Sequence, residues 1–158
     1  MATQPSPAPP VTEFAGQFFF RLWRATHTRT ADVLSSVGLT PALFALLNVI
    51  RAREGAIQQE LGSALGIDRS TMVSLIDQLE SAGLARRRPS ATDRRAREIA
   101  ITPKGRRILK RARGLISEVE DEVLAGLSSK ERRELFGLLR RALEHAPTQP
   151  VWSAAEGD

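Results

Sequence analysis

Apolar residues at helical spacing open the chain. Over residues 12–36 they recur every three or four positions, as at Phe14 and Phe18, and this period predicts an amphipathic helix. Phe19 and Trp23 flank that stripe and widen it. A terminal helix with so broad an apolar face usually packs on a second helix, often from another subunit.

The next segments alternate between apolar runs and glycine breaks. Thr40 followed by Pro41 indicates a helix start, and the nearly continuous apolar run to Ile50 predicts a central, buried helix. Residues 57–65 predict a short helix that stops at Gly66.

The helix that follows has two clearly divided faces. Asp68 is predicted to cap it and Gly83 to end it. Its apolar positions are Met72, Leu75, Ile76 and Leu79. Its polar positions are Ser70, Ser74, Asp77, Gln78 and Ser81. Two helices joined by a tight turn are a helix-turn-helix candidate, and Gly62 with Gly66 would let them approach closely.

Two short strands come next. Residues 84–88 predict a strand, residues 89–95 a turn-rich loop, and residues 99–101 the return strand. A helix-turn-helix followed by such a hairpin is a winged arrangement. The predicted fold is therefore mainly α, a winged helix-turn-helix with a small β-hairpin wing.

The remaining helices and the chain ends complete the predicted organisation. Long helices are predicted after Thr102 and after Ser128. The two ends are predicted to be a disordered arm and a flexible tail, because they are rich in proline and small or polar residues. The predicted units are an arm at 1–11, a helical region at 12–36 and 103–146, a winged helix-turn-helix lobe at 38–102, and a tail at 147–158.

Charge is distributed unevenly along the chain. It has 23 basic and 18 acidic residues, yet residues 84–113 hold twelve basic and two acidic ones, a net charge of +10. A cationic segment in an otherwise acidic chain is typical of a nucleic-acid binder, and a merely solvated surface is the simpler alternative. Two interpretations are equally open for three of these residues, contact with DNA or RNA phosphates and simple exposure to solvent: Arg106, Arg107 and Arg111.

Composition excludes several classes of protein. The absence of Cys excludes disulfides, thiolate metal sites and thiol switches. His27 and His145 are single and far apart, which disfavours a metal site, and no nucleophile–base pair or phosphate loop indicates an enzyme. No apolar run approaches the ~20 residues that span a membrane, and no secretory signal is recognisable. We therefore expect a cytoplasmic protein with no membrane partner and no cofactor.

The divided helix and the hairpin together suit double-stranded DNA. The N-terminal half of the helix would present Arg69, Ser70, Thr71 and Ser74 to the major groove. The hairpin loop would carry an arginine into the neighbouring minor groove. Side chains alternate along a strand, so not all three arginines at 86–88 can face DNA, and Arg86 and Arg88 are the candidates. Asp77 argues against close phosphate approach farther along the helix.

Residues 61–109 resemble the core of a MarR-type (multiple antibiotic resistance regulator) transcription factor. The motifs that carry the resemblance are "DRRA" at 93–96, "IAITPKG" at 99–105 and "LESAGL" at 79–84. The resemblance implies that Arg94 is the minor-groove residue at the wing tip. It implies that Asp93 and Arg95 hold the shape of the wing. Many relatives carry Arg where this chain has Ser74 or Gln78, and Gly62 stands where Ala is more usual.

The resemblance also implies that residues 12–36 and 103–146 form a helical dimerisation platform, which carries a DNA-binding lobe at 38–102. It implies a function as well. The expected protein is a sequence-specific repressor that binds a pseudo-palindromic operator as a homodimer and that a small aromatic or apolar anion could release. Four residues could line an effector pocket, although core packing or an ordinary surface role is the simpler reading for each: Phe19, Trp23, His27 and Phe44. The alternative function is a non-specific basic nucleic-acid-binding module without operator specificity.

Overall fold

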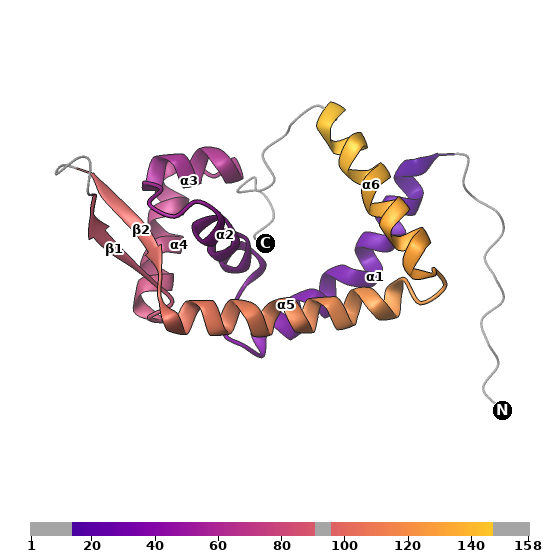
Figure 1. The fold of residues 1–158 in the computed structure, drawn as a ribbon, viewed down its shortest axis with the longest axis horizontal. Helices are drawn as coiled ribbons and strands as arrows, with labels where there is room; N and C mark the ends of the chain where they lie inside the picture. The colour runs from indigo at the N-terminus through magenta and orange to yellow at the C-terminus, as the bar shows by residue number, and fades with distance from the viewer. Residues whose placement is uncertain (1–13, 91–95, 147–158) are drawn as a thin grey trace.

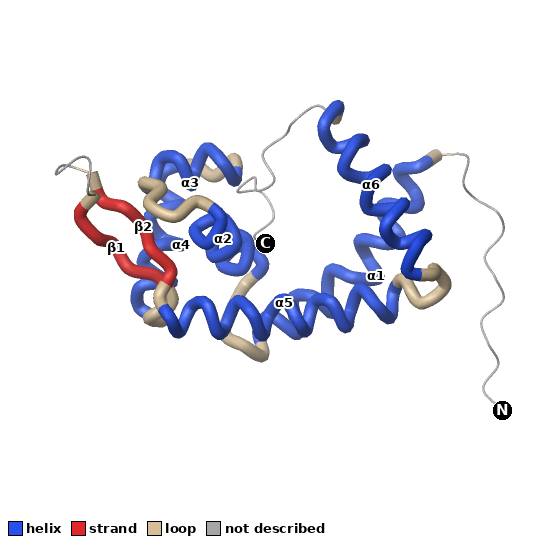
Figure 2. The backbone as a smooth tube through the Cα atoms, in the orientation of Figure 1, coloured by secondary structure: helices blue, strands red, loops and turns tan. Residues whose placement is uncertain are grey.

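Six helices and one β-hairpin make up the part of the chain that the computed structural model describes, residues 14–90 and 96–146 (Figures 1 and 2). The elements are α1 (Ala15–Ser35), α2 (Pro41–Ala52), α3 (Gln58–Leu65), α4 (Arg69–Ser81), β1 (Ala85–Pro89), β2 (Arg97–Ile101), α5 (Pro103–Val123) and α6 (Ser129–His145). Figure 1 shows α2, α3, α4 and the hairpin at one end, α6 and the start of α1 at the other, and α5 running between them. The predicted arm at 1–11 and tail at 147–158 lie outside the described residues.

The lobe at the hairpin end is built around one apolar core. Leu46, Leu47 and Ile50 of α2 are almost completely buried, as the continuous apolar run predicted. The same core includes Leu34 from the end of α1 and Leu109 from the first half of α5. Both α1 and α5 thus extend into the core of the lobe, and the predicted bounds of lobe and platform stay predictions.

The predicted helix-turn-helix is present as α3, a tight turn and α4. Gly66 ends α3 in the left-handed conformation, with φ of 65°, which glycine adopts without strain. Gly62 faces the turn, and a Cβ there would lie 3.1 Å from the carbonyl oxygen of Ile67. Glycine at position 62 thus has a packing reason, the close approach of α3 to the turn, despite its weak helix propensity.

The hairpin is slightly longer than the sequence pattern predicted. β1 and β2 pair antiparallel, and the last pair joins Pro89 to Arg97. Pro89 was expected in the loop, but proline is tolerated at the end of an edge strand. An isolated bridge between Ile57 and Glu98 adds a third segment to the sheet. A single bridged pair has no periodic signal, so the sequence pattern did not predict it.

A compact joint connects α4, the hairpin and α5. The Oγ1 of Thr102 accepts a hydrogen bond from the Gly105 N–H at 3.0 Å and donates one to the Gly83 carbonyl oxygen at 2.7 Å. The Nζ of Lys104 donates to the Ala82 carbonyl oxygen, just past the end of α4, at 2.7 Å. The "TPKG" sequence therefore fixes the C-terminal end of α4 onto the first turn of α5.

The platform end of the molecule leaves apolar surface uncovered. No residue of α6 is buried. Ion pairs join α5 to α1 through Arg29 and Glu122, and α5 to α6 through Asp121 and Arg132. Exposed ion pairs add little stability. The large apolar side chains exposed at this end are Phe14, Phe18, Phe19, Phe20, Leu22, Trp23, Phe136, Leu138 and Leu143.

Candidate nucleic-acid interface

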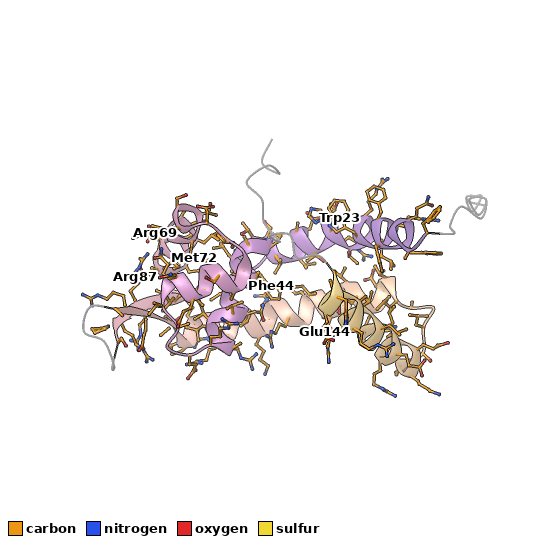
Figure 3. All side chains as sticks on the ribbon, turned by 90° about the horizontal axis from the view of Figure 1, so that it is seen from above. Trp23, Phe44, Arg69, Met72, Arg87 and Glu144 are labelled. Atoms are coloured by element: carbon orange, nitrogen blue, oxygen red, sulfur yellow. The ribbon has the colours of Figure 1, made fainter. Side chains whose placement is uncertain are left out.

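The two faces of α4 are divided as the sequence predicted. The apolar positions Met72, Leu75, Ile76 and Leu79 are buried. The four predicted major-groove residues lie on the exposed side of its first two turns: Arg69, Ser70, Thr71 and Ser74. Figure 3 shows Arg69, Met72 and Arg87 at the hairpin end of the molecule, on the far side from Trp23. The lobe core therefore holds α4 so that its polar side faces solvent.

Asp68 holds the first turn of α4. Its carboxylate accepts hydrogen bonds from the backbone N–H groups of Ser70 and Thr71 at 2.9 and 3.0 Å, and from the Ser70 hydroxyl at 2.6 Å. These bonds, above all the one from the Ser70 side chain, stabilise the ionised carboxylate and hold the pKa of Asp68 well below its ordinary value. Asp68 is thus the predicted N-cap.

Arg87 ties the hairpin to α4, a role that the sequence analysis missed. Its backbone N–H donates to Oε1 of Glu80 at 2.6 Å. Its Nη1 contacts Oδ1 of Asp77 at 2.7 Å and also the Glu80 carboxylate. Partial burial alone would lower the pKa of Arg87, but the two carboxylates outweigh that effect and raise it. The sequence did contain a signal for this contact, because Asp77 and Glu80 lie three residues apart near the end of a helix, shortly before the arginines at 86–88.

This ion pair changes the expected effect of Asp77. The carboxylate was expected to keep phosphate away from the second half of α4. The Arg87 side chain, 29% exposed, lies against it and offsets its charge. The polar face of α4 is therefore less repulsive to a polyanion than the sequence alone suggested.

The other two strand arginines are exposed, as alternation along β1 predicted. The Nε of Arg88 donates to Oε2 of Glu98 at 3.0 Å, and the Glu98 side chain is only 12% exposed. Arg86 has no ion-pair partner within residues 14–90 and 96–146. The DNA contacts of Arg86 and Arg88 remain predictions.

The tip of the wing lies outside the described residues. It includes Asp93, Arg94 and Arg95, so their predicted roles in DNA contact and in wing shape stay predictions. The paired ends of the strands, Pro89 and Arg97, bracket the segment.

Part of the positive charge of α5 is matched by neighbours. Arg106 pairs with Glu54 at 3.2 Å, and the Nε of Arg113 donates to Oδ1 of Asn48 at 2.9 Å. Arg107 and Arg111 are exposed and form no ion pair with the described part of the chain. The cations most available to a polyanion therefore include Arg107 and Arg111 rather than Arg106.

Two cavities adjoin α4. One of about 870 Å³ lies between α3, the start of α4 and the loop end of strand β2, with Arg69 and Arg97 in its lining. One of about 650 Å³ runs along the exposed side of α4, where Ser70 and Ser74 line it opposite Gly38. None of the four predicted effector residues lines either cavity.

The predicted effector residues do not form one site within a single chain. The rings of Trp23 and His27 stack on α1 with centroids 4.5 Å apart, and Phe19 is half exposed on the same helix. Phe44 packs against the lobe core, and Figure 3 shows it on a different part of the molecule from Trp23. An effector pocket formed by all four remains a prediction.

The described residues contain no cluster of three or more potential metal-ligating side chains of the His, Cys, Asp or Glu type. Within the same ranges, no helix has the length and apolar character needed to cross a membrane.

These features define a class of protein. A helix-turn-helix whose second helix exposes a polar face beside an arginine-rich hairpin is a winged helix-turn-helix lobe, here joined to a helical platform.

The model of the MarR family matches residues 37–96. The chain is also 36% identical over 141 residues to a putative transcriptional regulatory protein for the hcr operon of Thauera aromatica, covering 87% of this chain and 85% of that protein. The chain belongs to the MarR family of transcriptional regulators, as its motifs indicated.

Solved structures share the fold. The transcriptional repressor CouR, bound to a 23-mer DNA duplex, is 32% identical with a TM-score of 0.73, over 83% of this chain and 93% of that chain. The PcaV transcriptional regulator from Streptomyces coelicolor, in complex with its natural ligand, is 26% identical with a TM-score of 0.66, over 90% and 100% of the two chains. The predicted winged helix-turn-helix fold is therefore confirmed.

Proposed function

We propose that this protein represses transcription by binding operator DNA as a homodimer. The N-terminal half of α4 enters the major groove, and the hairpin reaches the neighbouring minor groove. The observation that carries the proposal is the exposed polar face of α4, locked by Arg87 to an arginine-rich hairpin. The similarity to CouR, which was solved on a DNA duplex, supports the same use of this lobe.

Two copies of the chain complete the DNA-binding surface. The apolar faces of α1 and α6 are exposed in one chain, with Trp23 at 51% and Leu138 at 56%. Large apolar side chains exposed in such number at one end of a molecule mark an interface. A two-fold pairing through these helices would set the two α4 helices one DNA turn apart, roughly 34–36 Å. The operator is therefore a pseudo-palindrome.

A small apolar or aromatic anion is the proposed effector. It would release DNA by binding more tightly to a lobe spacing that does not fit the operator. The exposed Trp23–His27 stack provides an aromatic surface for such a ligand. PcaV, which is 26% identical to this chain and was solved in complex with its natural ligand, supports the proposal that a small molecule controls this protein.

The testing experiment is a gel shift and footprint on the DNA upstream of the protein's own gene, with excess random duplex as competitor. An operator-specific dimer keeps its band and protects two half-sites one turn apart. Displacement by random duplex would instead favour the alternative, a non-specific basic module. Candidate aromatic acids added to the same assay test for release.

The wing is tested in the same assay by Arg94→Ala. Affinity should fall several-fold or more. The slope of log affinity against log salt concentration should become shallower by about one, the change expected for one lost phosphate contact. Arg133→Ala removes the same charge from an exposed position on α6 and is the matched control. Equal effects from the two substitutions would show that net charge, not the wing, controls binding.

A further inference from the structure

One apolar side chain of the lobe is exposed where a polar one would be expected. Ten large apolar side chains are exposed among the described residues. Nine belong to α1, its N-cap or α6, the helices assigned to subunit pairing. The tenth is Val73 of α4, which is 37% exposed. Subunit pairing accounts for the nine and does not account for Val73.

Val73 lies within the surface of α4 that is proposed to enter the major groove. It follows Ser70 by one helical turn and precedes Ser74, and all three line the cavity of about 650 Å³ along this helix. The adjacent Met72 points into the core and is 1% exposed. A β-branched residue is a weak helix former, and the exposed 37% of Val73 has no packing partner among the described residues. A bound partner would supply the apolar contact that the free protein lacks.

We propose that Val73 recognises the C5-methyl group of a thymine in each operator half-site. The inference rests on the proposed function of the lobe. The thymine methyl is the apolar group that a base pair displays in the major groove, and aliphatic side chains read it by direct contact. Ser70 and Ser74 lie on either side of Val73 along the helix. The Ser74 hydroxyl faces the polar edge of a neighbouring base, and the Ser70 oxygen, whose proton is donated to Asp68, can accept a hydrogen bond from one. The surface thus reads a thymine flanked by hydrogen-bonding positions.

The test replaces single thymines by deoxyuridine, which removes the methyl group and keeps the base pair. The operator is first selected from a random duplex pool, so that each thymine of one half-site can be replaced in turn. At one position the wild type should lose about fourfold in affinity, the effect of one methyl group returned to water. Val73→Ala should bind the intact operator more weakly by a similar factor and show no further loss on replacement at that position.

Two controls separate direct recognition from indirect effects. Ser81→Ala alters the far end of the same exposed face and should leave the fourfold loss intact. Val73→Ala removes no charge, so its salt dependence and its affinity for random duplex should match those of the wild type.

The outcomes are distinct. If deoxyuridine has no effect at any position, or lowers the affinity of wild type and Val73→Ala equally, Val73 does not read a methyl group although operator binding stands. If selection yields no preferred sequence, the proposed operator function fails, and the role of Val73 fails with it.

Discussion

Gly105 is the position where one added carbon atom should damage the lobe most. A Cβ there would lie 2.9 Å from Cγ1 of Ile101, and nearer still to the Leu84 carbonyl oxygen. That oxygen accepts hydrogen bonds from the N–H and the Oγ1 of Thr102, at 3.0 and 3.2 Å. Because the clash is with backbone already held by two bonds, Gly105→Ala can be accommodated only if α5 moves away from the hairpin.

The expected loss of stability follows from three contributions. Overpacking costs roughly 1–3 kcal/mol, and the upper end applies because the obstructing atoms are backbone. Breaking a backbone hydrogen bond adds about 1 kcal/mol. The better helix propensity of alanine returns at most about 1 kcal/mol. The net effect of Gly105→Ala should be a destabilisation on the order of 3 kcal/mol.

Gly114→Ala is the matched control in the same helix. A Cβ added at Gly114 would meet no neighbouring atom within 4 Å, so only the propensity gain of up to about 1 kcal/mol applies. Urea unfolding followed by circular dichroism, at one fixed protein concentration because pairing affects stability, measures both variants. A Gly105→Ala variant within about 0.5 kcal/mol of wild type would refute the steric argument.

Three further substitutions probe the interface, the platform and the cap of α4. Arg87→Gln should weaken operator binding about tenfold by releasing the Asp77 carboxylate, and adding Asp77→Asn should restore part of the affinity; no recovery would indicate that Arg87 itself contacts DNA. Leu138→Glu should shift the protein to monomers in sedimentation experiments, because it puts a charge into the apolar surface of α6, whereas Ser81→Glu on the lobe should not. Asp68→Ala should lower the urea midpoint at neutral pH. Folding depresses the pKa of Asp68, so the stabilisation by its carboxylate is present above the ordinary pKa of 3.8 and is lost as pH falls below it. The difference in urea midpoint between wild type and Asp68→Ala should therefore narrow in acid. A difference that stays constant with pH would mean that the ionised carboxylate is not the cause.

The sequence alone determined the elements of this protein and the exposed side of its recognition helix. Asp68, Gly66 and Gly83 mark the ends of α3 and α4 through interactions with residues a few positions away. The apolar period of α4 likewise needs no knowledge of the rest of the fold. For these reasons the helix-turn-helix, the hairpin and the location of Ser70 and Ser74 on a solvent-facing surface were predictable.

The tertiary structure decided how these parts are joined. The ion pairs of Arg87 with Asp77 and Glu80 depend on the angle between β1 and α4, and no periodicity encodes that angle. The bridge from Ile57 to Glu98 joins residues far apart in the chain. Caps and periodicity act over one or two helical turns, whereas these contacts exist only once distant segments pack on a shared core.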